Sequence, residues 1–142
     1  MMSFSWGQMV PEPVVHRTFS INGEKGELKN LAKGFHWREG LFWQGKKLLE
    51  YKSGLERSGL YSVQTFFSKK FRRKKAFVVI MWNKGAHSQM MEVWAMPEAK
   101  KVWEQSTYYA GKASIKEDIL HIAYSRDNPK DPKLSKKFYF SD

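Results

Sequence analysis

The run of apolar residues from Ala76 to Trp82 is the feature that most constrains the fold of this chain. It reads Ala-Phe-Val-Val-Ile-Met-Trp and contains no polar residue. Because successive side chains of a strand point to opposite faces, an unbroken apolar run is typical of a central strand covered on both sides. The chain then turns at Asn83-Lys84-Gly85 and returns as Met90–Met96. The sequence therefore predicts a sheet with a buried centre.

The size of the chain sets the number of domains. It has 142 residues, of which 42% are hydrophobic, enough for one substantial core, so we expect a single domain over residues 1–142. There is no cysteine, which excludes disulfides and thiolate zinc sites and fits a reducing compartment. No apolar run approaches the roughly 18 residues of a membrane span, and the N-terminus lacks the layout of a secretory signal. We expect a cytoplasmic protein with no membrane partner.

Aromatic residues alternate with other residues after Gly34, and this pattern predicts a meander of three short strands. The strands are expected at Phe35–Trp37, Leu41–Trp43 and Lys47–Lys52, with a tight turn at Gln44-Gly45. A closing edge strand is expected at Lys137–Phe140.

Two segments before the apolar run have features of helices. Residues 24–33 follow Asn22, which stands near the N-cap position. From 55 to 71, apolar residues recur at helical spacing and form one stripe. We expect a helix in each segment, the second ending in a cluster of cations.

Two more helices are expected after the apolar run. Pro97 stands at a favourable first position for a helix over 98–105, and a capping box opens a helix over 114–124. The predicted order is helix, three strands, helix, two strands, two helices and a strand. This order indicates an α/β (α+β) fold, in which a mixed central sheet is flanked by helices.

The positive charge of the chain indicates a polyanionic partner. The net charge of +11 exceeds the magnitude of about 2 to 8 that keeps a small domain soluble. Part of it is concentrated around Phe71, where cations would repel one another unless they bind phosphates. A solvated helix end is the alternative interpretation, and an anionic membrane is less favoured. The candidate nucleic-acid-binding cations are Lys69, Lys70, Arg72, Arg73, Lys74 and Lys75.

A Glu-x-Lys tripeptide at Glu50 and Lys52 is the candidate catalytic centre. Side chains two residues apart on a strand share a face, so these two would project together while Tyr51 points into the core. Glu39 begins the preceding strand, and a hairpin turning at Gln44-Gly45 would bring its carboxylate to that of Glu50. Carboxylate oxygens are the ligands that Mg²⁺ prefers. We therefore expect Glu39 and Glu50 to hold a metal ion.

These residues resemble the motif of the PD-(D/E)XK nuclease superfamily, in which an acid precedes Glu-x-Lys on a meander. The resemblance covers roughly residues 24–96 and implies a core order of helix, three strands, helix and strand. It implies a metal-dependent endonuclease that hydrolyses DNA with Mg²⁺ or Mn²⁺, and cutting both strands favours a homodimer. It assigns metal binding to Glu39 and Glu50 and a catalytic role to Lys52. Some members add an acid and a polar residue, for which the matches are Glu27 and Gln64.

The chain departs from the family pattern at the upstream acid, which is Glu39 where most members have Asp. A member that kept the fold and lost cleavage would serve as a non-catalytic nucleic-acid-binding domain. A small ribonuclease toxin and a phage-encoded interaction protein are further alternatives. Two aromatic residues near the expected site, Trp37 and Trp43, are candidates for stacking on a base.

Overall fold

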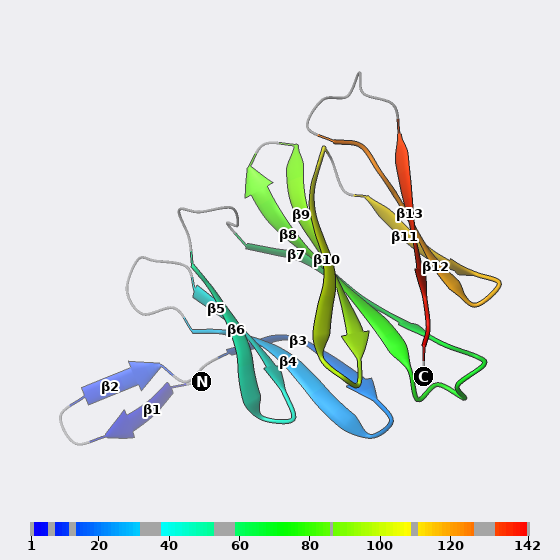
Figure 1. The fold of residues 1–142 in the computed structure, drawn as a ribbon. Coiled ribbons are helices and arrows are strands. Elements are labelled where there is room, and N and C mark those ends of the chain that lie inside the picture. Colours follow the sequence, from blue (N-terminus) through cyan, green and yellow to red (C-terminus); the bar gives the residue numbers. More distant parts are fainter. Residues whose placement is uncertain are drawn as a thin grey trace. The chain divides into compact units, whose positions relative to one another are not determined.

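A computed structural model describes residues 2–5, 8–11, 14–31, 38–52, 59–85, 87–108, 111–126 and 133–141. Among these residues there is no helix, and every sheet is antiparallel (Figure 1). The predicted α/β (α+β) fold with a helix-flanked mixed sheet is therefore wrong: the described chain is all-β. None of the described elements is a helix long and apolar enough to cross a membrane.

The chain divides into two compact units, residues 1–55 and 56–142. The first unit contains a hairpin and a four-stranded sheet, and one face of that sheet carries buried side chains, among them Ile21, Leu28 and Leu41. The expectation of one domain over 1–142 stays a prediction. The hairpin consists of β1 (Met2–Ser5) and β2 (Gln8–Pro11), and the sheet, in spatial order, of β3 (Val14–Ile21), β4 (Glu24–Asn30), β5 (Arg38–Trp43) and β6 (Lys46–Lys52).

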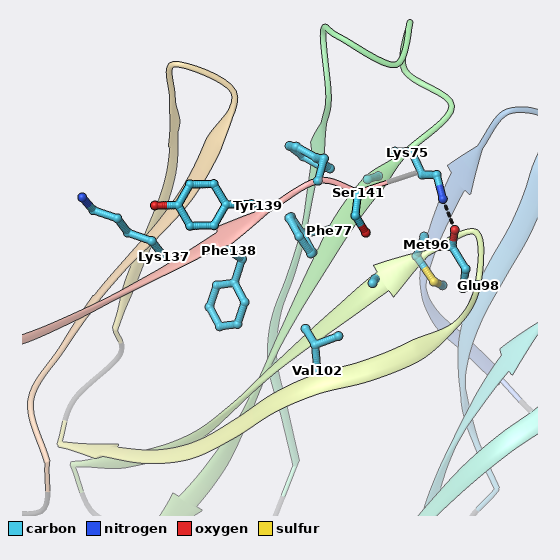
Figure 2. A pocket seen from close by; sticks show the side chains of 12 residues that line it. Lys75, Phe77, Met96, Glu98, Val102, Lys137, Phe138, Tyr139 and Ser141 are labelled. Atoms are coloured by element: carbon cyan, nitrogen blue, oxygen red, sulfur yellow. Dashed lines mark hydrogen bonds and ion pairs between the residues drawn. The ribbon is translucent and has the colours of Figure 1, made fainter.

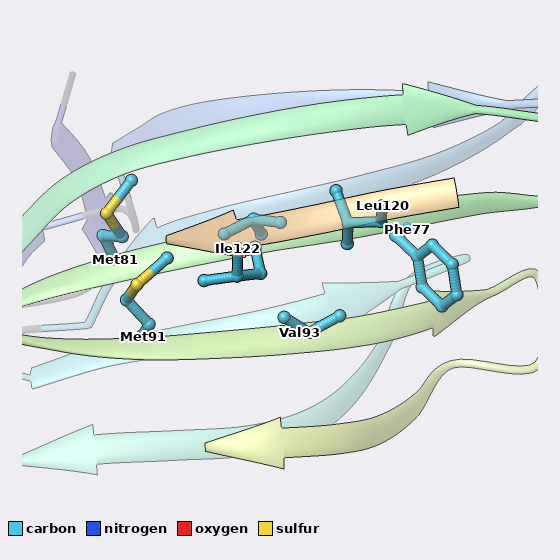
Figure 3. Packing of buried hydrophobic residues seen from close by; sticks show 7 residues of the cluster. Phe77, Met81, Met91, Val93, Leu120 and Ile122 are labelled. Atoms are coloured by element: carbon cyan, nitrogen blue, oxygen red, sulfur yellow. The ribbon is translucent and has the colours of Figure 1, made fainter. Parts of the chain in front are cut away.

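The second unit contains two sheets that pack face to face. Their shared core is an apolar cluster in which Leu120 and Ile122 of one sheet meet Val79, Met91 and Val93 of the other (Figure 3). The four-stranded sheet is formed, in chain order, by β7 (Gly59–Phe67), β8 (Ala76–Gly85), β9 (Ser88–Met96) and β10 (Lys100–Tyr108). The three-stranded sheet is formed by β11 (Lys112–Lys116), β12 (Ile119–Tyr124) and β13 (Leu134–Tyr139).

Three hairpins close through two-residue turns whose central residues both have positive φ. The turns are Asn22-Gly23 (52° and 82°), Gln44-Gly45 (52° and 79°) and Glu117-Asp118 (54° and 58°). This backbone matches the right-handed twist of the flanking strands, and Asn, Asp and Gly adopt it with the least strain. The turns fix the register of the strands on either side.

Each predicted helix within the described residues is a strand or a hairpin. Residues 24–30 form β4, because Asn22 begins a hairpin turn rather than capping a helix. Residues 59–67 form β7, whose β-branched and aromatic residues suit a pleated strand. The predicted helix over 98–105 is a turn followed by β10, and the one over 114–124 is the β11–β12 hairpin.

The predicted strands that lie within the described residues are present. Ala76–Trp82 forms the buried part of β8, where every residue is buried, and β9 contains Met90–Met96. The hairpin at Gln44-Gly45 is present between β5 and β6. Lys137–Phe140 overlaps β13, which lies at the edge of its sheet. The predicted strand at Phe35–Trp37 lies outside the described residues.

Candidate nucleic-acid interface

The cationic cluster forms the connection between β7 and β8, and we call Lys69–Lys75 the basic turn. Its ends are joined by two backbone hydrogen bonds, from Ser68 N to the Lys75 carbonyl oxygen and from Arg73 N to the Ser68 carbonyl oxygen, both 2.9 Å. Arg72 and Arg73 have φ values of 52° and 65°. The cluster is therefore the turn of a β-hairpin, and the prediction that it ends a helix is wrong.

Asp118, in the turn between β11 and β12, holds the first part of the basic turn in place. Its Oδ2 accepts a hydrogen bond from Ser68 Oγ at 2.7 Å, and its Oδ1 accepts one from Lys69 N at 2.9 Å. Burial raises the pKa of Asp118, but these hydrogen bonds and the charge of Lys70 outweigh burial, so that the pKa lies below its usual value. One ionised carboxylate thus fixes the backbone that carries the cations.

The cations of the basic turn differ in what they contact. The Arg73 guanidinium lies 4.4 Å from the centre of the Phe67 ring, a cation–π contact that fixes the direction of the side chain. Lys75 forms an ion pair with Glu98 and is only partly exposed. Five cations are exposed to solvent: Lys69, Lys70, Arg72, Arg73 and Lys74.

Most of the net positive charge belongs to the second unit. Residues 56–142 contain 17 Lys or Arg and nine Asp or Glu, a net charge of +8 out of the +11 of the whole chain. The basic turn is the densest part of this charge. It therefore presents a locally positive surface without an acidic residue of its own.

The register of the β5–β6 hairpin separates the two predicted metal ligands. Glu39 pairs with Tyr51, and Gly40 pairs with Glu50. Directly paired residues of antiparallel strands point to the same face, so Glu39 and Glu50 point to opposite faces. Glu39 is fully buried beside Tyr51, whereas the Glu50 side chain is partly exposed. The expectation that the two carboxylates meet is wrong.

A β-bulge causes this separation. The pairing passes from Phe42–Lys47 to Leu41–Leu49, so Leu48 is an extra residue in β6. Without the bulge, continuing the pairing from the turn would place Glu39 opposite Glu50. One extra residue moves every later side chain of the strand to the other face. The described residues therefore do not fit a Mg²⁺ or Mn²⁺ site shared by Glu39 and Glu50.

Glu50 instead belongs to a group of charged residues on the polar face of its sheet. Its Oε1 accepts a hydrogen bond from Arg38 Nη2 at 2.7 Å and lies 3.4 Å from Lys47 Nζ. The hydrogen bond from Arg38 outweighs the effect of burial, and Lys47 adds to it, so the pKa of Glu50 lies below its usual value. Lys52 pairs with Arg38 in the register, but its side chain is outside the described part of the chain.

The remaining predicted site residues are dispersed. Glu27 of β4 lies 3.8 Å from both Lys25 and Lys29 in ion pairs. Gln64 is exposed on β7. Trp43 is buried and stacks on Phe19 with 5.9 Å between ring centres, so it belongs to the core. Trp37 lies outside the described residues.

Asp118, the residue that positions the basic turn, is not among the site residues predicted from the sequence. The signal for it is the alternation of polar and apolar residues on both sides of Glu117-Asp118, which is typical of a two-residue hairpin. A group of three or more His, Asp or Glu side chains able to hold a metal ion does not occur in the described part of the chain. No family model, curated protein or solved structure matches this chain.

Proposed function

We propose that this protein is a nucleic-acid-binding domain that contacts backbone phosphates through the basic turn. The observation that carries the proposal is the set of five exposed cations on one turn, held by Asp118. Lys and Arg bind phosphate by charge and release condensed counterions, which makes such binding strong at low salt and independent of sequence. The expected polymer is DNA, and the expected location is the cytoplasm.

The fixed conformation of the turn favours binding of backbone phosphates over loose association with dissolved counterions. A hairpin turn that is fixed by hydrogen bonds loses little conformational entropy on binding, so its cations are arranged before the ligand arrives. Arg73, held on the Phe67 ring, adds a planar group of donors that suits phosphate oxygens. This preorganisation separates the basic turn from isolated surface lysines such as Lys112.

The test is the salt dependence of binding to a short DNA duplex, measured by fluorescence anisotropy. Five phosphate contacts predict a slope of log K against log salt of about −4.5, at about −0.9 per contact. Replacing Arg72→Glu together with Lys74→Glu should leave three phosphate contacts and therefore a slope of about −2.7. Neither side chain takes part in the contacts that hold the turn, so the conformation of the turn should be retained. The matched control is Lys112→Glu with Lys133→Glu, which makes the same change in net charge at exposed positions elsewhere in the second unit.

Two results would count against the proposal. Equal slopes for the two double variants would mean that total charge, and not the basic turn, binds the polymer. Metal-dependent cleavage of the duplex in Mg²⁺ or Mn²⁺, abolished by Glu50→Gln, would contradict a purely binding role and favour the endonuclease predicted from the sequence. Competition with RNA of the same length measures whether DNA is preferred.

A further inference from the structure

A pocket of about 320 Å³ lies in the second unit, next to the basic turn. It opens between the end of β13 and the sheet of β8, β9 and β10 (Figure 2). Its walls are mainly apolar, with Phe77, Met96, Val102, Phe138 and Phe140 among the lining residues. Lys75, the last residue of the basic turn, also lines it and forms an ion pair there with Glu98.

The pocket is joined to the basic turn by more than Lys75. Tyr139, another lining residue, pairs in the register with Ile119, the residue after Asp118. Asp118 in turn accepts hydrogen bonds from Ser68 and from Lys69 of the basic turn. The end of β13 at the pocket and the backbone of the basic turn are therefore connected through the β11–β12 turn.

The lining suits a flat aromatic ligand. Phe77 lies 4.6 Å from Phe140 between ring centres, in a stacked arrangement, and 5.9 Å from Phe138. The volume is at the lower end of the range of about 300 to 1,000 Å³ for ligand pockets, which suits one small ring system better than a long acyl chain. Tyr139 and Lys137 are exposed on the opposite side of β13 from Phe138 (Figure 2), so the aromatic surface of the pocket is that of Phe138 and Phe140, which are both partly exposed.

We propose that this pocket receives one unpaired nucleobase of a single-stranded nucleic acid whose phosphates lie on the basic turn. The inference rests on the proposed function and adds to it a preference for single strands. Stacking on aromatic side chains accepts any base, because every base has an aromatic face. A base held in a duplex is paired and stacked already, so it is not available to the pocket.

The experiment compares three ligands of equal length at one salt concentration by fluorescence anisotropy: an oligothymidylate, the corresponding abasic strand and a duplex. Stacking of a base contributes about 1–3 kcal/mol, so the oligothymidylate should bind about 5- to 150-fold more tightly than the abasic strand. Phe140→Leu, which removes an aromatic ring of the lining and keeps an apolar side chain, should reduce this ratio, and Val102→Trp, which fills the pocket from its exposed rim, should bring it close to one. Binding of the abasic strand should not change in either variant.

The control is Tyr61→Ala, which removes an exposed aromatic ring from β7, away from the pocket lining. Equal binding of the abasic strand and the oligothymidylate to the unmodified protein would overturn the base pocket and leave the basic turn in place. An unchanged ratio in both Phe140→Leu and Val102→Trp would also overturn it. Loss of salt-dependent binding to all three ligands would instead refute the proposed function. Displacement of a pocket-bound dye by a medium-chain fatty acid, but not by oligothymidylate, would reassign the pocket to an apolar anion.

Discussion

Replacing Asp118→Asn tests whether one carboxylate holds the basic turn. Asn has the same shape and tolerates the positive φ of 58° at this position, so the β11–β12 turn should form as before. The substitution removes the negative charge and one of the two acceptor oxygens. In the folded protein these oxygens accept hydrogen bonds from Ser68 Oγ at 2.7 Å, Lys69 N at 2.9 Å and Lys70 N at 3.4 Å.

The size of the expected loss of stability follows from those three hydrogen bonds. A hydrogen bond to a charged group contributes about 1.5–3 kcal/mol, and a neutral one about 0.5–1.5 kcal/mol. Asn loses one acceptor and weakens the remaining contacts from charged to neutral, while partial exposure of the site allows water to replace part of the loss. We expect the free energy of unfolding to fall by about 2 kcal/mol, which lowers the melting temperature by several degrees.

The difference in the free energy of unfolding between the unmodified protein and Asp118→Asn should depend on pH in a defined direction. The pKa of Asp118 is lower in the folded protein than its usual value of 3.8, so the unfolded chain takes up a proton more readily as the pH falls. The contribution of the carboxylate is therefore complete above the unfolded value and is lost as the pH falls through the lower folded value. The stability difference should be constant from pH 7 to about pH 5 and should shrink as the pH falls below the unfolded value of 3.8.

The assay is urea unfolding followed by tryptophan fluorescence at pH 7, 5 and 3. Glu117→Gln serves as the control, because Glu117 is exposed in the same turn and is also a carboxylate. Equal stability of Asp118→Asn and Glu117→Gln at pH 7 would refute the role of Asp118. A difference that persists unchanged at pH 3 would refute the assignment of that role to its charge.

Two further substitutions test the first unit. In Gly26→Ala, the new Cβ would overlap the Phe19 ring, which stacks on Trp43, so the ring must move and stability should fall by about 1–3 kcal/mol. A melting temperature equal to that of the exposed-site control Ser20→Ala would contradict this packing. In Glu50→Gln, the loss of the ion pair with Arg38 should reduce stability by about 0.5–1 kcal/mol at pH 7. Because the folded pKa of Glu50 is lowered from 4.5, this loss should disappear as the pH falls through that lowered value, and urea midpoints at pH 7 and pH 3 measure it.

Some of the fold was predictable because it depends on local pattern. The apolar run of β8 has no polar residue to place on a solvated face, so its burial on both sides follows from composition alone. Gln44-Gly45 between aromatic, alternating segments is sufficient to predict a hairpin. The exposure of the basic turn follows from the cost of burying unpaired charge.

The predicted helices failed where helical and strand signals competed. Residues 24–30 contain Glu, Lys and Leu, which favour a helix, but Asn22-Gly23 is a strong hairpin signal, and Gly26 faces the Phe19 ring of the neighbouring strand. In β7, Leu60, Val63 and Phe66 recur at helical spacing, but the strand propensity of these residues prevails. An edge strand need not alternate strictly between polar and apolar residues.

The candidate site failed for a different reason. The distance along the chain from Glu39 to Glu50 suits an unbulged hairpin with a turn at Gln44-Gly45. The extra residue, Leu48, reverses the faces, and nothing in the sequence marks it as the position of a bulge. Asp118 was not predictable as a partner of the basic turn, because 48 residues or more separate it from its hydrogen-bond donors.

The connectivity of the sheets has a consequence for the speed of folding. Within every sheet of the described chain, each strand pairs with the strand before or after it in the sequence. Hairpins of this kind close on a timescale of about 1–10 μs, and the entropy lost in closing a short loop is small. Proteins made of β-sheets usually fold slowly because distant strands must find one another. Here the pairing steps are local, so the rate-limiting step is expected to be the docking of the β11–β13 sheet onto the β7–β10 sheet.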